Sequence, residues 1–452
     1  MKTVTKKILL VYLPFCTPAS PPYSVTQLYS FLKGNTDSGV EVLDLNLEFH
    51  KLKFSKYQKY YHNHKKWQDY DQKTVEYHRL TSKCYTENNK KVVKGGKPEH
   101  FQELLNKIEE QKPDIVAFSL VYSSQAFYAY SLIKELKDVT TIIGGPAVNE
   151  KLSAVADKTL KNEIELLNYV QGKEVKDENI NYDTVPDFTI YNLQEYFTPF
   201  PVIPIRTSTT CYYKKCTFCA HFSDVKYYEF SLNWIKKTVI KSKQKHFFLI
   251  DDMIPAKRLL KIAKMLKPLN VKWTCQLKPT TDFSSEILKT LSASGLTMVI
   301  WGVESGNNRV LNLMKKGTNR KDVETVLQAS HQAGIKNVVY IMFGFPGETK
   351  QEFLETIDFL KKNQENIDLI STSIFGLQKG TFVYKNPQKF KIIKIVEKER
   401  TLLSPKISYQ LTAGLSSEEV KRLVKGHKLT IEKINKYPRM MNYFREHMFC
   451  LC

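Results

Sequence analysis

Short apolar segments alternate with amphipathic, helix-like segments along most of this chain, in two successive series. A short apolar run closed by Gly or Pro is typical of a buried parallel strand. In the first series, such runs lie at residues 7–13, 40–46, 113–119 and 140–146. Strands that alternate with helices predict a doubly wound parallel sheet, so we expect an α/β domain over residues 1–195.

Ligands bind an open α/β sheet at the carboxyl ends of its strands. In this domain those ends are residues 12–23, 119–125 and 144–149. We therefore take Tyr122, Gly144 and Gly145 as candidate ligand-binding residues.

The second series of strand-like runs follows residue 200. Its members lie at residues 204–208, 246–250, 271–276, 297–301, 337–342 and 369–374. About six β/α units predict a partial (β/α)6 barrel of the TIM type over residues 196–385, with its active site at the carboxyl ends of the strands. Residues 386–452 are basic and are expected to form a small helical C-terminal region.

Composition excludes few classes of protein. The hydrophobic content of 42% is ordinary for a globular protein, and no apolar run is long enough to span a bilayer, so we expect no membrane partner. The net charge of +22 is compatible with nucleic acid. Lysine spread through the whole chain fits an acidic peptide or another anionic substrate at least as well, so nucleic acid is the less favoured partner. The Lys- and Tyr-rich stretch 51–97 is expected to form inserted helices and a substrate-recognition surface.

The chain has eight cysteines, three of them close together, which suits a reducing cytoplasm better than a disulfide scaffold. The apolar run near the N-terminus is too short for a signal peptide and is followed by Pro14 and Cys16, so a first strand fits better. We expect Cys450 and Cys452 to lie in a frayed tail. A redox or metal role would require that tail to fold back to the barrel mouth.

Cys211, Cys216 and Cys219 fall within nine residues, directly after the first strand of the expected barrel. Thiolates grouped in this way usually hold a metal, and both a structural zinc and a 4Fe-4S cluster take four ligands. His221 follows Cys219 too closely for easy tetrahedral closure around zinc. The pattern therefore favours a 4Fe-4S cluster on three thiolates with one iron open, at the mouth of the barrel.

These features resemble the radical S-adenosylmethionine (SAM) enzymes, in the branch with an N-terminal cobalamin (B12)-binding domain, over about residues 1–385. The resemblance implies that the open iron binds SAM and that the cluster cleaves it to a 5′-deoxyadenosyl radical. The commonest family pattern has three residues between the first two cysteines, whereas four lie here, Tyr212 to Lys215. Phe218 matches the family's aromatic residue near the adenine.

Further strand ends match the same family. The resemblance implies that Asp251 and Asp252 meet the amino group of the SAM methionine, and that Lys278 faces its carboxylate. Glu304 and Ser305, in the run Trp-Gly-Val-Glu-Ser-Gly, are expected at the methionine or ribose.

The turn Gly-Phe-Pro-Gly-Glu resembles the family's turn against the adenine, with Gly344 and Gly347 allowing close backbone approach. Glu348 is expected to start the next helix.

The N-terminal domain resembles the Rossmann-like cobalamin-binding domain, with the turn 142–147 near the place of the nucleotide tail. The motif Asp-x-His-x-x-Gly, whose histidine binds cobalt in other cobalamin proteins, is absent. The resemblance implies cobalamin-dependent C-methylation of a peptide or natural product, with an electron donor such as flavodoxin or ferredoxin.

Three alternatives stay open. The first is cobalamin-independent peptide modification, namely epimerisation, crosslinking or rearrangement. The second is a tRNA methylthiotransferase, which is disfavoured because that group carries extra N-terminal cysteines and only Cys16 and Cys84 are present. The least favoured is a non-catalytic zinc or nucleic-acid-binding protein.

Overall fold

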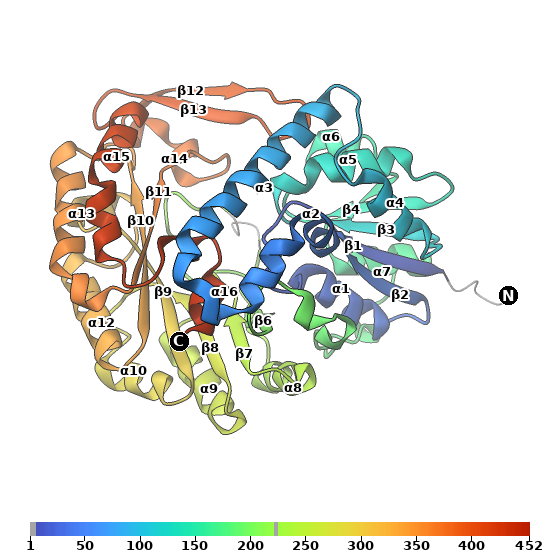
Figure 1. Ribbon diagram of the computed structural model, residues 1–452, viewed down its shortest axis with the longest axis horizontal. Coiled ribbons are helices and arrows are strands. Elements are labelled where there is room, and N and C mark those ends of the chain that lie inside the picture. The colour runs from blue at the N-terminus through green and yellow to red at the C-terminus, as the bar shows by residue number, and fades with distance from the viewer. Residues whose placement is uncertain (1–5, 221–224) are drawn as a thin grey trace. The chain divides into compact units, whose positions relative to one another are not determined.

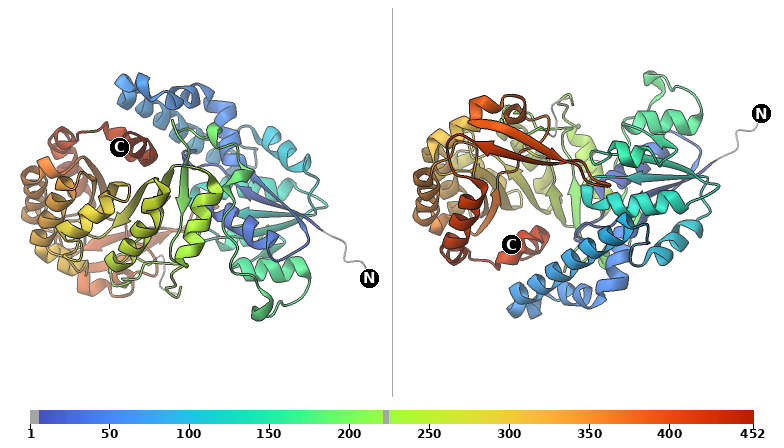
Figure 2. Two further views of the ribbon diagram at one scale, coloured as in Figure 1. Left: turned by 90° about the horizontal axis from the view of Figure 1, so that it is seen from below. Right: turned by 90° about the horizontal axis from the view of Figure 1, so that it is seen from above.

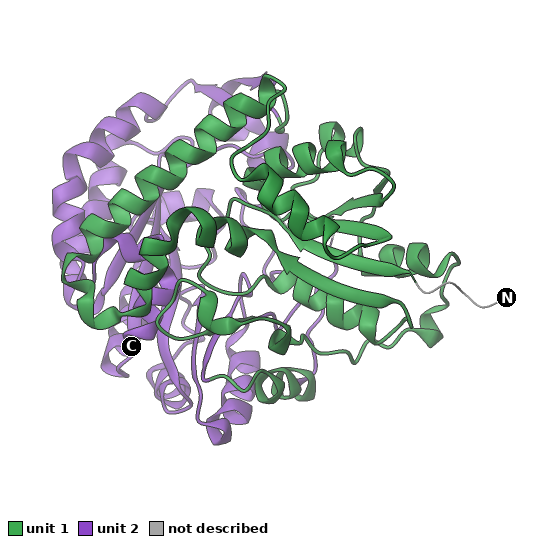
Figure 3. Ribbon diagram, turned by 45° about the vertical axis from the view of Figure 1, so that its right-hand side comes forward, with its two compact units in different colours: residues 1–204, 233–244, 400–404 green, residues 205–232, 245–399, 405–452 purple. Residues whose placement is uncertain are grey.

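The computed structural model describes residues 6–220 and 225–452 (Figure 1). The chain divides into two compact units (Figure 3). Unit 1 comprises residues 1–204, 233–244 and 400–404, and unit 2 comprises residues 205–232, 245–399 and 405–452. Of the expected C-terminal region 386–452, all residues but 400–404 fall in unit 2.

Unit 1 contains a five-stranded parallel sheet with the strand order β2-β1-β3-β4-β5. Its strands are β1 (Lys7–Tyr12), β2 (Gly39–Asp44), β3 (Ile115–Ser119), β4 (Thr140–Gly144) and β5 (Lys158–Thr159). Its helices are α1 (Tyr23–Lys33), α2 (Leu45–His62), α3 (Tyr70–Val93), α4 (Phe101–Glu109), α5 (Ala126–Glu135), α6 (Glu150–Ser153), α7 (Glu163–Gln171) and, from Asn233 on, α8 (Leu232–Ser242). Short 3-10 helices are η1 (His64–Asp69), η2 (Ser123–Gln125), η3 (Asp177–Asn179), η4 (Phe188–Ile190) and η5 (Leu193–Glu195). The predicted doubly wound sheet is confirmed.

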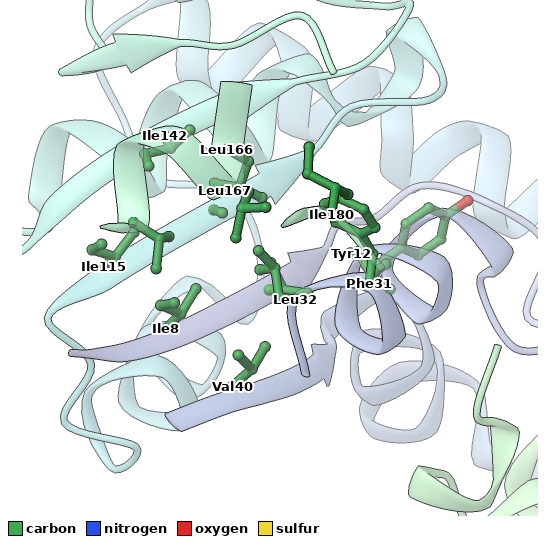
Figure 4. Close-up of a cluster of buried hydrophobic side chains, with 14 residues drawn as sticks. Ile8, Tyr12, Phe31, Leu32, Val40, Ile115, Ile142, Leu166, Leu167 and Ile180 are labelled. Carbon is green, nitrogen blue, oxygen red and sulfur yellow. The ribbon is translucent and has the colours of Figure 1, made fainter. Parts of the chain in front are cut away.

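The core of unit 1 follows from the two-residue period of its strands. Alternate residues of β1, among them Ile8 and Tyr12, point to the same face of the sheet and pack against α1 and α7 (Figure 4). Leu32 of α1 and Leu167 of α7 are fully buried there. Because all strand pairs of this sheet are parallel, the carboxyl ends of its strands lie along one edge.

The basic insert consists of α2, η1 and α3, the long blue helix in Figure 1. Its tyrosines form an internal core rather than a surface: Tyr57, Tyr61, Tyr70 and Tyr77 are all buried. Lysines lie at its surface, and several pair with carboxylates, for example Lys56 with Glu76 at 3.1 Å. The insert is therefore helical, as predicted, but its tyrosines serve its own packing.

Unit 2 contains a six-stranded sheet with the order β11-β10-β9-β8-β7-β6, in which the pairs from β7 to β11 are parallel. Its strands are β6 (Val202–Ile205, of which Ile205 is in unit 2), β7 (His246–Leu249), β8 (Lys272–Leu277), β9 (Leu296–Glu304), β10 (Lys336–Phe343) and β11 (Leu369–Ile374). Its helices are α9 (Ala256–Leu266), α10 (Ser285–Ser292), α11 (Asn308–Leu313), α12 (Arg320–Gln332), α13 (Lys350–Lys362), α14 (Phe382–Lys385), α15 (Ser417–Ile434) and α16 (Arg445–Cys450), with 3-10 helices η6 (Lys267–Leu269), η7 (Gln364–Asn366), η8 (Pro387–Phe390) and η9 (Arg439–Asn442). The six strands agree with the predicted partial barrel.

Local sequence explains where several of these helices begin. Thr349 caps α13 and Ser416 caps α15, each in a reciprocal capping box with a glutamate three residues later. Among the described residues, none of the helices combines the length and apolar character needed to cross a membrane.

The C-terminal region is only partly helical. Strands β12 (Ile392–Lys398) and β13 (Lys406–Leu411) form an antiparallel hairpin, which the view from above in Figure 2 shows as two arrows. Its apolar residues, among them Ile395 and Tyr409, pack on a cluster that includes Phe345. The helical prediction missed this hairpin, because the exposed face of its strands carries lysines such as Lys394, Lys398 and Lys406.

The expected frayed tail is wrong. Helix α16 is packed within unit 2: Phe449 is buried and its ring meets that of His246, at the start of β7. Cys450 is buried, and the Cys452 thiol donates to the Met448 carbonyl at 3.1 Å. The tail thus reaches the amino-terminal ends of the barrel strands, opposite the end that carries the cysteine loop.

Candidate active site

The cysteine loop begins at the carboxyl end of β6 and is held there by Asp251, which follows β7. The Asp251 carboxylate accepts from the Thr207 amide at 2.9 Å and from the Ser208 hydroxyl at 2.6 Å. Burial raises the pKa of Asp251, and these hydrogen bonds oppose the shift. Asp251 therefore fixes the start of the loop, while its neighbour Asp252 is half-buried at the same strand end.

Of the three loop cysteines, Cys211 and Cys216 are half-buried and Cys219 is exposed. Burial raises the pKa of Cys216, and the Lys316 ammonium opposes the shift. Across residues 6–220 and 225–452, no three Cys, His, Asp or Glu side chains lie close enough together to hold a single metal ion. In a 4Fe-4S cluster each thiolate binds its own iron, so the thiols need not meet at one point. His221, weighed as a zinc ligand, lies outside the described residues.

Thr217 anchors the middle of the loop to the turn after α11. Its amide donates to the Met314 carbonyl at 3.0 Å, and its hydroxyl donates to the Leu313 carbonyl at 3.0 Å. Phe218, the next residue, is half-buried against the cluster of Val310 and Phe345. Phe218 therefore lies next to the cysteines in sequence and packs on this apolar cluster.

A buried ion pair lies beside the cysteines. Lys316 donates to Glu304 at 2.8 Å, and the two side chains are 5% and 14% exposed. Burial acts to lower the pKa of Lys316, but the Glu304 carboxylate together with Cys216 and Cys211 outweighs it, and the pKa is raised. Glu304 has a φ of 71°, a left-handed conformation that costs a non-glycine residue free energy and that often marks functional sites.

Lys278 lies at the end of β8, as predicted, and is 4% exposed. Its Nζ stands 3.3 Å from the centroid of the Tyr213 ring, in the cysteine loop. Burial lowers the pKa of Lys278 to about 8. The structure therefore brings Lys278, Glu304 and the cysteine loop together at one end of the barrel.

The remaining predicted residues of this unit are Ser305, Gly344 and Gly347, and the structure shows their local hydrogen bonds and backbone conformation. The buried Ser305 hydroxyl lies 3.1 Å from that of Thr356 and accepts from the Asn307 amide. Gly344 (φ 76°) and Gly347 (φ 87°) both have the left-handed conformation that glycine tolerates.

Glu348 closes the turn that contains these glycines. Its carboxylate accepts from the Gly344 amide at 2.5 Å, and burial raises its pKa to about 7. Glu348 is thus a structural residue of the turn before α13.

In unit 1, Tyr122 is 54% exposed at the carboxyl edge of the sheet. Its loop is fixed by Gln125, whose side chain accepts from the Tyr122 amide and donates to the Leu13 carbonyl, both at 2.9 Å. At Gly145 (φ 114°) a Cβ would stand 2.4 Å from the Leu120 carbonyl oxygen, so only glycine lets these two loops pack. Gly144 is restricted similarly, by the Leu160 carbonyl at 3.0 Å.

Sequence reasoning missed three residues of the site: Tyr213, Thr217 and Lys316. Lys316 lies in the run Met-Lys-Lys-Gly, residues 314–317. A lysine next to a lysine gives no sequence signal of which one is buried. Lys316 is buried and Lys315 is exposed, which only the packing decides.

Comparison with known proteins agrees with this geometry. Residues 205–360 match the model of the radical SAM superfamily. The chain is 23% identical over 339 residues to an uncharacterized methyltransferase of Pyrococcus horikoshii, a match that covers 63% of this chain and 72% of the relative. It is 29% identical over 134 residues to a tRNA-2-methylthio-N(6)-dimethylallyladenosine synthase of Thermotoga petrophila, which covers only 28% and 29% of the two chains.

Two solved structures share the fold along almost the whole chain. One is the cobalamin-dependent SAM radical enzyme OxsB with aqua-cobalamin bound, at 14% identity and a TM-score of 0.65, covering 99% of this chain and 71% of that one. The other is the radical SAM methyltransferase TsrM of Kitasatospora setae with cobalamin and a [4Fe-4S] cluster bound, at 13% identity and a TM-score of 0.63, covering 95% and 89%.

Residues 205–360 are therefore a radical SAM domain, and the chain is an enzyme. The radical SAM domain implies a 4Fe-4S cluster and SAM. Along almost its whole length, the chain shares the fold of OxsB and TsrM.

Proposed function

We propose that this enzyme is a cobalamin-dependent radical SAM methyltransferase that methylates a carbon atom of a peptide or natural product. The observation that carries the proposal is the cysteine loop at the carboxyl end of a radical SAM barrel, within a chain whose fold matches cobalamin-dependent enzymes from end to end. The proposal includes an electron donor such as flavodoxin or ferredoxin, and it places the reaction in a reducing cytoplasm.

The donor set fits the cluster. Cys211, Cys216 and Cys219 are the thiols that would hold it, and the ammonium groups of Lys278 and Lys316 lie near enough to stabilise negative charge there. When bound, the cluster supplies the electron that cleaves SAM to methionine and a 5′-deoxyadenosyl radical. The contacts of Asp251 and Thr217 orient the loop, and the apolar residues around Phe218 exclude water from this end of the barrel.

In this proposal, cobalamin binds at the carboxyl edge of the sheet in unit 1. Tyr122 presents an exposed ring on a loop that Gln125 fixes, so little ordering is needed when a ligand binds. Gly145 is required for the packing of the edge itself. Cobalamin at this edge is therefore part of the proposal, with Tyr122 as its contact residue.

Cobalamin-independent chemistry and methylthiotransfer are less well supported. The two cysteines of unit 1 are separately engaged: Cys16 accepts from the Tyr12 hydroxyl at 3.2 Å, and Cys84 donates to Glu99 at 3.3 Å. Residues 1–204 contain no third cysteine for a second cluster. The match to the tRNA enzyme covers less than a third of either chain, whereas a ribosomal protein uS12 methylthiotransferase of Thermoanaerobacter matches 66% of this chain at 22% identity.

The test is anaerobic reconstitution with iron, sulfide and SAM under a strong reductant, with and without hydroxocobalamin. We expect bound iron, bound corrinoid, 5′-deoxyadenosine and S-adenosylhomocysteine. Cys216→Ala should abolish 5′-deoxyadenosine, whereas Cys84→Ala, outside the loop, should retain it. No 5′-deoxyadenosine from fully iron-loaded wild-type protein refutes the radical reaction, and 5′-deoxyadenosine without corrinoid binding refutes the methyl transfer.

A further inference from the structure

The four-residue gap between Cys211 and Cys216 contains Tyr213, whose ring lies over the ammonium group of Lys278. The backbone of the gap includes Lys214 in the left-handed region, at φ 49°. Just before this bend, Tyr213 extends away from the loop to the turn after α11. Its hydroxyl donates to the Lys315 carbonyl at 2.8 Å.

The turn after α11 leaves space for the Tyr213 side chain because it contains Gly317. Gly317 has a φ of 68°, and a Cβ at this position would stand 2.3 Å from the Tyr213 hydroxyl oxygen. No other residue type could occupy position 317 without displacing the tyrosine. Two segments far apart in the sequence are therefore matched to each other through this one side chain.

Under the Tyr213 ring lies the ammonium group of Lys278. A buried charge normally has a partner of opposite charge or a set of hydrogen bonds. Within the described residues, no hydrogen bond or ion pair engages Lys278 Nζ; its contact is the Tyr213 ring, 3.3 Å from Nζ to centroid. The neighbouring Lys316 differs, because Glu304 already balances its charge. Of these two buried lysines, only Lys278 retains its capacity for an anion.

We propose that Tyr213 is a positioning residue that holds the Lys278 ammonium ready for the carboxylate of the SAM methionine. The ring stabilises the desolvated charge through its π face and restricts the side chain to one orientation. Tyr213 makes this contact from within the four-residue gap of the cysteine loop. The inference rests on the proposed function, because it takes SAM as the ligand.

The test compares three variants, each reconstituted and left unreduced so that no turnover occurs. Tyr213→Leu removes the ring, Tyr213→Phe removes only the hydroxyl, and Tyr212→Leu alters the neighbouring tyrosine, which lies near Tyr227. Affinity is measured by equilibrium dialysis for SAM and for decarboxylated SAM, after iron content has been matched.

We expect Tyr213→Leu to raise the Kd for SAM about tenfold. Tyr213→Phe should raise it less, and Tyr212→Leu should leave it unchanged. Decarboxylated SAM should bind the wild type and Tyr213→Leu with the same affinity, because it lacks the group that Lys278 receives. An unchanged Kd for SAM in Tyr213→Leu overturns the proposal, as does an equal loss of affinity for both ligands.

A second measurement needs no cofactor. Reductive methylation of the apoprotein, read by mass spectrometry, should leave Lys278 unlabelled in the wild type and label it in Tyr213→Leu, with the exposed Lys214 labelled in both. Equal protection of Lys278 in the two proteins overturns the contact. If the wild type binds SAM but yields no 5′-deoxyadenosine on reduction, the proposed function fails while the role of Tyr213 stands.

Discussion

Acidification from pH 7 to pH 5 is expected to destabilise the helical insert of unit 1 through His50. This histidine of α2 is 1% exposed, and the Tyr77 hydroxyl of α3 lies 2.7 Å from its Nδ1. Its ring thus joins the two helices of the insert. Burial lowers the pKa of His50 from 6.5 to about 3.

The sign and size of the effect follow from these two pKa values. The unfolded chain takes up the His50 proton near pH 6.5, whereas the folded protein takes it up only near pH 3. Between these values the unfolded state binds more protons, so stability falls as the pH falls. From pH 7 to pH 5 the loss is about 2 kcal/mol.

Asp44 acts in the opposite direction. Burial raises its pKa to about 6, so the folded state binds the extra proton as the pH falls from 6 towards 4. Its contribution over the same interval is a gain of about 1 kcal/mol. The wild type alone therefore shows only the difference, and the His50 effect has to be isolated by substitution.

Hydrogen exchange by mass spectrometry on peptides of α2 and α3 measures the opening free energy of the insert in the full chain. His50→Phe keeps an aromatic ring of similar size and removes the titration. From pH 7 to pH 5, wild-type peptides should lose about 2 kcal/mol more protection than those of His50→Phe. The same pH dependence in both proteins would refute the reasoning.

Two further predictions concern the buried ion pair of Lys316 and Glu304 and the close backbone contact at Gly145. Lys316→Met should cost about 3–5 kcal/mol in urea unfolding, because the Glu304 carboxylate is left buried without its counter-ion. Adding Glu304→Gln should restore most of that loss, and a double variant as unstable as the single one would contradict the buried-pair argument. Gly145→Ala should lower the thermal stability of the apoprotein far more than Gly172→Ala. Both glycines have positive φ, but a Cβ at Gly145 meets the Leu120 carbonyl whereas nothing lies within 4 Å of Gly172. Equal losses would show that this close contact is not what restricts position 145.

The strands and the glycine turns could be predicted because their signals are local. The apolar runs that became β1, β3 and β7 to β11 are contiguous in sequence, and burial on a parallel sheet requires little else. The hairpin β12–β13 was missed, since only one of its faces is covered and its exposed face carries lysines. The packed C-terminal helix α16 was missed because its partners, such as His246 of β7, lie far away in the sequence.

The predicted site residues also fall into two groups, those with a local sequence signal and those whose role depends on tertiary contacts. Cys216 and Glu304 could be recognised from spacing and from the residues around them. The role of Asp251 in fixing the cysteine loop could not, because it depends on the hydrogen bonds of Thr207 and Ser208. Ser305 was expected at a ligand, which stays a prediction; what only the structure shows is that its hydroxyl lies within hydrogen-bond distance of Thr356 in α13.

The sequence by itself determined the class of fold and predicted where the chemistry takes place, because three thiols on one loop after a strand are a local pattern. Only the tertiary structure decided which charges share the site. The pairing of Lys316 with Glu304, and the ring of Tyr213 over Lys278, join segments whose separation in sequence carries no signal of contact.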